Sequence, residues 1–439
     1  MSKFRSSSPW SWIPTLYVAE GLPYFAVNTL TILMYHEMGV GMTEMTYLTG
    51  WLYLPWVIKP FWSPFLDLFS TKRKWIIFME LLIGLSMAGV AFFLNLSNFL
   101  TLTLICFWFM AFFSATHDVG ADGFYILALS SHKQAQFVGI RSTFYRIASI
   151  IGQGGIVILA GYFEQTTGSI PTAWTWVFAI LSVLFLIFSF YHWLVLPVSA
   201  DDRPQKTSSA KEILIGFFNS FVTFFKRPYI ISALFFMLFY RFPEALCIKV
   251  VQPFLVSPVN EGGLGLTTSE VGFVNGTAGV IALLLGGILG GLAIARGGIK
   301  KWLWPMALSL TLPCFFYCIL ASFQPANLWG ISVAVFIEQF GYGFGFSAYM
   351  LYLLYFSRGE NSTSHYAFCT AFMALGMMLP GMAAGWLFEN VTIFNNPENV
   401  VPQNFVNFFW LVMIACGVTL VACRFVKIDG NFGVKTKGS

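Results

Sequence analysis

Charged side chains are scarce in this sequence. Asp, Glu, Lys and Arg make up 10% of the 439 residues, and hydrophobic residues make up 57%. A soluble domain carries about 25% charged residues, so most of the surface of this chain must face lipid. Apolar runs of spanning length recur from Trp10 to Phe425 and leave no stretch long enough for a soluble domain. We therefore expect an all-α integral membrane protein, whose first apolar segment is retained as a helix.

The sequence also lacks the signatures of other protein classes. Its glycine-rich runs are not followed by Lys-Ser/Thr, which argues against an ATP-driven pump. The seven cysteines fall in apolar segments, so they are expected to be packing residues, and no metal or cofactor is predicted. His117 and Asp122 match an acyltransferase spacing, but five residues on a helix turn the two side chains apart. We expect no enzyme.

Twelve apolar segments have the length of a membrane-spanning helix. The basic residues orient them, because Lys and Arg accumulate on the cytoplasmic side. With a cytoplasmic N-terminus, 19 of the 24 Lys and Arg fall on that side, and the rest lie within helices. Both termini are then cytoplasmic, and the net charge of +5 is an insertion signal rather than a nucleic-acid-binding surface. The predicted spans are residues 10–36, 45–67, 75–96, 99–124, 137–163, 173–196, 229–257, 269–294, 302–322, 329–356, 364–389 and 404–425.

The longest connection divides the twelve spans into six and six. Its second part has a Phe-rich helical pattern suited to the membrane interface. The predicted organisation is a six-helix bundle over 1–196, a cytoplasmic linker with an amphipathic helix over 197–228, a second six-helix bundle over 229–425, and a cytoplasmic tail over 426–439.

The two halves contain matching segments. Glu44 and Gly50 recur as Glu270 and Gly276, both displaced by 226 positions, before helices of the same orientation. The inner ends of those helices also match, with an acid and bases in the first copy and Ala295 in place of the acid in the second. This doubled loop resembles the signature of the major facilitator superfamily. The resemblance implies two six-helix bundles related by a pseudo-twofold axis. Charges at these helix termini are expected to latch the halves as a gate, and they are Asp67, Lys72, Arg73 and Arg296.

Within that superfamily the chain resembles the AmpG-type muropeptide permeases and their acetyl-CoA transporter relatives. The resemblance implies proton-driven import of an anhydromuropeptide or a related amino-sugar or oligosaccharide solute by a monomer in a Gram-negative inner membrane. A carrier or exporter of another solute class, such as a drug, a siderophore or an acyl-CoA, remains the alternative. The matching stretches are Glu20-Gly-Leu-Pro23, Leu54-Pro55 through Asp67, Ser114 through Asp122, Gly139-Ile-Arg141 with Tyr145-Arg146, and Tyr240 through Glu244 with Gln252-Pro-Phe-Leu255.

Ionisable residues inside the predicted spans are the candidates for chemistry. A charge at the bilayer centre costs at least about 2.5–3.5 kcal/mol, so each needs a partner, a wet cavity or a proton. Asp118 and Asp122 lie four apart on one face of the fourth span, and Arg141 and Arg146 follow on the fifth. Either these groups pair structurally, or one aspartate carries the coupling proton. We expect Asp118 to carry it and Asp122 to pair with Arg141.

Substrate contacts are expected where Gly and Pro loosen the first and seventh spans. Arg241 suits a carboxylate or phosphate, and the alternative is that Arg241 and Glu244 simply pair within one turn. Aromatic rings could stack on sugars, although interfacial belts explain many of them. The predicted substrate-binding residues are Glu20, Lys59, Tyr145, Arg241, Glu244 and Glu338.

Overall fold

A computed structural model describes most of the chain, and every regular element within the part it describes is helical. The chain forms two compact units, each of which takes residues from two stretches. The first contains Met1–Met38 and Ile58–Phe218, and the second contains Gly39–Val57 and Asn219–Ser439. The described residues are 8–63, 66–129, 131–198, 202, 210–358, 362–394 and 402–428.

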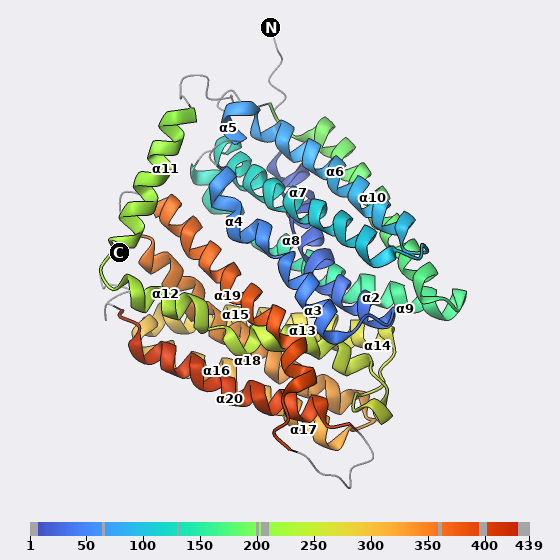
Figure 1. The fold of residues 1–439 in the computed structure, drawn as a ribbon. Helices are drawn as coiled ribbons and strands as arrows, with labels where there is room; N and C mark the ends of the chain where they lie inside the picture. The colour runs from blue at the N-terminus through green and yellow to red at the C-terminus, as the bar shows by residue number, and fades with distance from the viewer. Residues whose placement is uncertain are drawn as a thin grey trace. The chain divides into compact units, whose positions relative to one another are not determined.

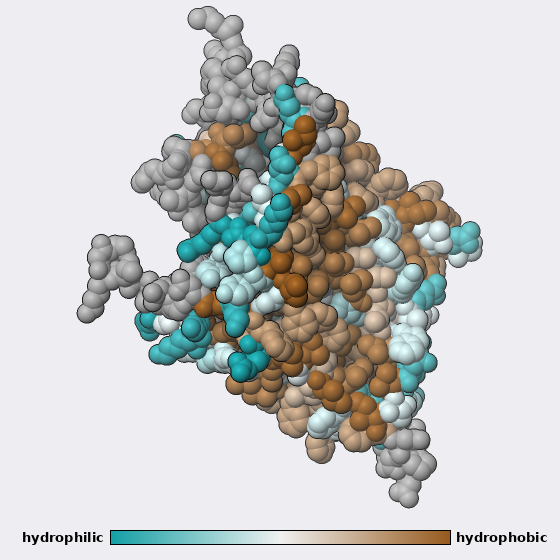
Figure 2. Space-filling view, turned by 60° about the vertical axis from the view of Figure 1, so that its left-hand side comes forward, coloured by the Kyte–Doolittle hydropathy of each residue, from teal (hydrophilic) through white to brown (hydrophobic). Residues whose placement is uncertain are grey.

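Long apolar helices dominate both units. Nine helices in the described part of the chain are long and apolar enough to cross a membrane. Figure 2 shows apolar side chains over much of the surface in that view, as expected where lipid is the solvent. The chain is therefore a multi-pass membrane protein. The nine helices are Lys72–Phe93, Phe99–Ala128, Ile140–Thr167, Ile170–Val195, Ile230–Val256, Thr268–Gly297, Ile299–Phe323, Ser364–Asn390 and Asn404–Phe425.

In the first unit α6 packs along both α7 and α10, and α1 packs along α8 (Figure 1). The approach of α1 to α8 depends on a small residue, because a Cβ on Gly21 would lie 2.7 Å from the Cβ of Ala148. The elements are a 3-10 turn Pro9–Ser11, α1 Ile13–Phe25, a π-helical turn Ala26–Leu30, α2 Thr31–Glu37, α5 Leu66–Phe69, α6 Lys72–Phe93, α7 Phe99–Ala128, α8 Ser131–Ile150, a π-helical turn Ile151–Gly155, α9 Ile156–Thr167 and α10 Ile170–Val195.

In the second unit α15 packs along α18, and α3 packs against α19. Thus α3, although it lies early in the sequence, belongs to the unit built from the C-terminal half. The elements are α3 Met42–Trp51, α12 Ile230–Phe239, α13 Phe242–Val256, a 3-10 turn Val259–Glu261, α14 Thr268–Val271, a π-helical turn Gly272–Gly279, α15 Val280–Gly297, α16 Ile299–Thr311, a 3-10 turn Leu312–Cys314, α17 Phe315–Phe323, α18 Leu328–Phe356, α19 Ser362–Asn390 and α20 Asn404–Phe425. Helices α4 Leu54–Trp62 and α11 Ala210–Phe225 each have residues in both units.

Several predicted spans, among them the first, second and seventh, differ from single straight helices. The second is divided into α3, α4 and α5, with the first break just before Pro55, which favours a helix start and disfavours a helix interior. The seventh is divided between Phe239 and Phe242, and Pro243 then lies in the first turn of α13. The first continues beyond Pro23 but widens into the π-helical turn.

The tenth predicted span corresponds to α18, which at 29 residues is long enough to cross a membrane.

The predicted amphipathic helix of the linker corresponds to α11. The preceding polar segment 199–209 lies outside the described residues except for Asp202, and so does the tail beyond residue 428.

Candidate functional site

Two ion pairs lie inside the first unit. Lys59 on α4 binds the carboxylate of Asp118 on α7. One turn along α7, Asp122 accepts a hydrogen bond of 2.6 Å from the Arg141 guanidinium of α8. The pairing of Asp122 with Arg141 expected from the sequence is therefore present. Asp118, in contrast, pairs with Lys59 of α4. The sequence argument did not predict that α4 would supply the positive charge that balances this carboxylate.

Aromatic rings fix the Arg141 guanidinium. Its central carbon lies 4.7 Å from the centre of the Tyr17 ring and 5.1 Å from that of Tyr125. The Tyr17 hydroxyl also donates to Asp122 over 3.4 Å. A cation between two aromatic faces and a carboxylate is held in one position, which favours a defined ion pair over a mobile side chain.

Glu20 adds a third carboxyl group to this cluster. It lies on α1 within hydrogen-bonding reach of Asp118, and its buried Oε2 atom has no hydrogen-bond partner among the described residues. Among the ion pairs of the described residues, two cations, Lys59 and Arg141, face these three carboxyl groups. Two carboxyl groups can share a hydrogen bond only if one of them holds a proton. The cluster therefore has the composition of a site that takes up one proton.

The other residues predicted for this part of the chain have different surroundings. Tyr145 is partly buried, and its ring lies 6.1 Å from that of Phe25. Arg146 is exposed on α8. The proton-coupling and substrate-binding roles assigned to these residues remain predictions.

The predicted gate residues of the first unit lie around the start of α6. The carboxylate of Asp202 accepts hydrogen bonds from the backbone N–H groups of Lys72 and Arg73, at 2.7 and 2.9 Å. The Arg73 guanidinium binds the carbonyl oxygens of Trp193 and Leu196. These contacts cap two helix termini within one unit. Asp202 is a contact that the sequence argument did not predict.

For the other two predicted gate residues, Asp67 and Arg296, the described part of the chain shows no ion pair. The Asp67 side chain lies outside the described part of the chain. Arg296 is exposed in the last turn of α15. Their gating role remains a prediction.

A second charged pair lies in the second unit, at the break between α12 and α13. Glu244 accepts two hydrogen bonds from the Arg241 guanidinium, at 2.7 and 2.5 Å. The same guanidinium donates to the Tyr342 hydroxyl at 2.9 Å and lies 4.8 Å from the centre of the Phe346 ring. The break between α12 and α13 thus brings the planar Arg241 guanidinium against the Glu244 carboxylate and against the aromatic side chains of α18.

Glu338 is largely enclosed. It is 7% exposed, and its Oε2 atom accepts hydrogen bonds from the Tyr317 hydroxyl and the Gln339 amide. These hydrogen bonds satisfy the buried Oε2 atom within the protein. A role of Glu338 in binding substrate remains a prediction.

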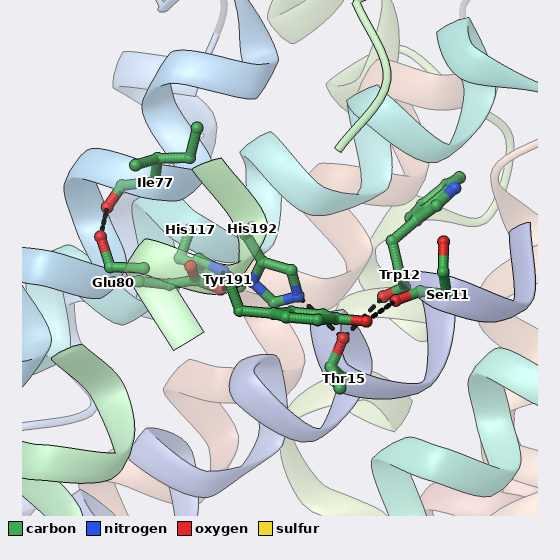
Figure 3. Close-up of polar contacts among 9 residues, drawn as sticks. Ser11, Trp12, Thr15, Ile77, Glu80, His117, Tyr191 and His192 are labelled. Atoms are coloured by element: carbon green, nitrogen blue, oxygen red, sulfur yellow. Dashed lines mark hydrogen bonds and ion pairs between the residues drawn. The ribbon is translucent and has the colours of Figure 1, made fainter. Parts of the chain in front are cut away.

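Sequence reasoning missed a buried cluster in the first unit. Glu80 of α6 meets His117 of α7 and His192 of α10, and all three are at most 1% exposed (Figure 3). A carboxylate in the middle of an otherwise apolar run was the signal available in the sequence. The partner His192 could not be assigned without the packing of α6 against α10.

The comparisons with known proteins agree with this architecture. The model of the Major Facilitator Superfamily matches residues 15–379. A Rickettsia conorii protein that carries the provisional name of transporter AmpG 4 is 23% identical over 82% of this chain and 85% of its own length. The anhydromuropeptide permease of Escherichia coli (strain K12) is 24% identical over 76% of this chain and 65% of its own length.

Solved structures show the same fold at lower identity. A bacterial homologue of the human lysosomal transporter Spinster, inward-facing and unoccupied, has a TM-score of 0.70 at 15% identity, with 96% of this chain and 98% of that chain covered. A D-xylose-proton symporter has a TM-score of 0.67 at 14% identity, with 96% and 97% covered. Because the family model spans most of the sequence, this chain belongs to the Major Facilitator Superfamily of membrane transporters.

Proposed function

We propose that the protein is a proton-coupled importer of an anhydromuropeptide or a related amino-sugar solute, working by alternating access. The observation that carries the proton coupling is the cluster of Glu20, Asp118 and Asp122, for which the ion pairs among the described residues supply two cations, Lys59 and Arg141. The substrate class rests on the resemblance to permeases of that name.

The coupling proton is assigned to the Glu20–Asp118 pair. Lys59 and Arg141 balance Asp118 and Asp122, so the third carboxyl group is the one that requires a proton when the cluster is enclosed. Glu20 has an unpartnered buried oxygen, which supports placing the proton on it. When the cluster becomes wet, water can stabilise the third negative charge and the proton can leave. The proton is thus coupled to the change of access.

The solute anchor is assigned to Arg241 and its aromatic surroundings in the second unit. An arginine fork matches a carboxylate, and a muropeptide carries carboxylates on its peptide. Glu244 holds the fork in position before the solute arrives. Tyr342 and Phe346 offer apolar faces on which a sugar ring can stack.

The location follows from the same assignment. The distribution of basic residues supports cytoplasmic termini, and a permease for this solute class works in the inner membrane of a Gram-negative cell. A monomer suffices for this mechanism, because one chain carries both charged clusters.

Uptake into proteoliposomes tests the proposal. Labelled anhydromuropeptides, neutral oligosaccharides and acyl-CoA would be offered with and without a pH gradient that is acidic on the side of solute entry. We expect accumulation of the anhydromuropeptide only with the gradient, and its loss when a protonophore is added. Equal uptake without a gradient would overturn proton coupling, and accumulation of acyl-CoA alone would favour the alternative solute class.

A further inference from the structure

The buried cluster of Glu80, His117 and His192 joins three helices of the first unit through one oxygen atom. The Oε1 atom of Glu80 lies 2.7 Å from Nδ1 of His192 and 3.2 Å from Nε2 of His117. The other oxygen, Oε2, is buried and has no hydrogen-bond partner in the described part of the chain. Figure 3 shows the three side chains turned toward one another, with Thr15 of α1 beyond His192. A single acceptor oxygen thus serves two imidazole rings.

Hydrogen bonding limits where the protons can be. Both imidazole nitrogens that face Oε1 must carry hydrogen if both contacts are hydrogen bonds to a carboxylate. The far nitrogen of His192, Nε2, lies 2.9 Å from the Thr15 hydroxyl, which also lies 3.2 Å from the Trp12 carbonyl oxygen. The hydroxyl has one hydrogen to donate. If that hydrogen goes to Trp12, the hydroxyl oxygen can accept a hydrogen bond from a second proton of His192, carried on Nε2.

Charge balance favours that second proton. An ionised Glu80 between two neutral imidazoles would be a buried, uncompensated negative charge, which is costly in a membrane protein. One additional proton on the imidazoles makes the cluster neutral. Because the nitrogen that faces Oε1 already carries a hydrogen in each ring, the additional proton goes to the far nitrogen of either ring.

We propose that Glu80, His117 and His192 form a second proton-binding site, separate from the Glu20–Asp118 pair. Among the described residues, the groups that face Glu80 are His117 from α7, His192 from α10 and, beyond His192, the uncharged Thr15 from α1. The next charge along α7 is Asp118, which pairs with Lys59 of α4.

His117 directly precedes Asp118 in the sequence, so a positive charge on its ring stabilises the neighbouring carboxylate. The state of the buried site therefore sets the pH range over which the Glu20–Asp118 pair exchanges its proton. This second step rests on the proposed function, whereas the existence of the proton site does not.

Nitrogen NMR of the protein labelled with ¹⁵N-histidine, in lipid nanodiscs and without solute, tests the proton site. We expect one cluster ring to show two protonated nitrogens at about pH 7. In Glu80→Gln this imidazolium signal should disappear, because the negative charge is gone. His192→Gln and His117→Gln assign the signals, and His36→Gln on α2 is the matched control that should change no cluster signal. Two neutral cluster rings in the wild type, or an imidazolium signal unchanged in Glu80→Gln, would overturn the proposal.

The pH profile of uptake tests the link to transport. Glu80→Gln should move the profile of gradient-driven uptake by about one pH unit, whereas a merely structural role would lower uptake at every pH alike. If Glu80→Gln does not fold, His117→Gln provides the same test. An unchanged profile in a folded variant would overturn the link. If wild-type uptake ignores the gradient while the imidazolium signal is present, the proposed function fails and the proton site stands.

Discussion

The ammonium group of Lys249 on α13 lies 3.0 Å from the hydroxyl oxygen of Thr49 on α3. Lys249 is 1% exposed, and its Nζ atom lies 5.5 Å from the centre of the Tyr53 ring. Within the described part of the chain, no carboxylate lies in ion-pair distance of it. The second unit therefore buries a cation whose neutral partners both come from the segment Gly39–Val57. Such a charge is costly, and it is typical of a functional position.

Replacing Lys249 should stabilise the protein. Lys249→Met keeps an unbranched side chain of similar length and removes the buried charge, so we expect a higher melting temperature in detergent. Thr49→Val is the matched variant. It removes the hydroxyl acceptor and leaves the ammonium buried, at a cost of about 1–3 kcal/mol, so the melting temperature should fall. A lower melting temperature for Lys249→Met would mean that the ammonium contributes net stability.

The architecture could be predicted from the sequence, but the charge pairing could only partly be predicted. Apolar length identified the spans, and the spacing of Asp118 and Asp122 placed both on one face of α7. Spacing along a helix does not say which other helix lies opposite. The contacts of Asp118 with Lys59 and of Glu80 with His192 depend on how α4, α6 and α10 pack, and no sequence period encodes that packing. The pairing of Arg241 with Glu244 was accessible because both lie within one turn.

Neutralising the proposed proton site should separate exchange from accumulation. In Glu20→Gln the third carboxyl group is replaced by a neutral group of the same shape, so the protonated state is mimicked. We expect solute counterflow to persist and gradient-driven accumulation to fall to background. Asp118→Asn should do the same and also leave Lys59 without its carboxylate, so it should be the less stable variant. Normal accumulation by Glu20→Gln would contradict the assignment of the proton to this pair.

The geometry of the Arg241 side chain should matter more than its charge. Arg241→Lys keeps the charge but cannot donate the two parallel hydrogen bonds to Glu244. We expect the KM of uptake to rise at least about tenfold, which corresponds to about 1.4 kcal/mol. The matched control is Arg227→Lys, two residues beyond the end of α11, where the guanidinium contacts His365 and the Phe356 ring. A KM that rises equally in both variants would point to a general effect of replacing a guanidinium rather than to a solute anchor.

The packing of α1 against α8 should depend on Gly21. A Cβ at this position would lie 2.7 Å from the Cβ of Ala148 and 3.3 Å from the carbonyl oxygen of Tyr145, so one helix must move. Gly21→Ala should therefore destabilise the protein by about 1–3 kcal/mol, measured as a lower melting temperature. It should also weaken gradient-driven uptake, because Glu20 is the preceding residue on α1.

The double variant Gly21→Ala with Ala148→Gly distinguishes crowding from other effects. Because Ala148→Gly removes the methyl group that the new Cβ would contact, the double variant should restore most of the loss in melting temperature. Gly291→Ala on α15 is the control, since no atom outside its own helix lies within 4 Å of the added methyl group. Ala is also the better helix former there, so this variant should be neutral or slightly stabilising. If the double variant is no more stable than Gly21→Ala alone, the close approach of α1 and α8 is not what the glycine provides.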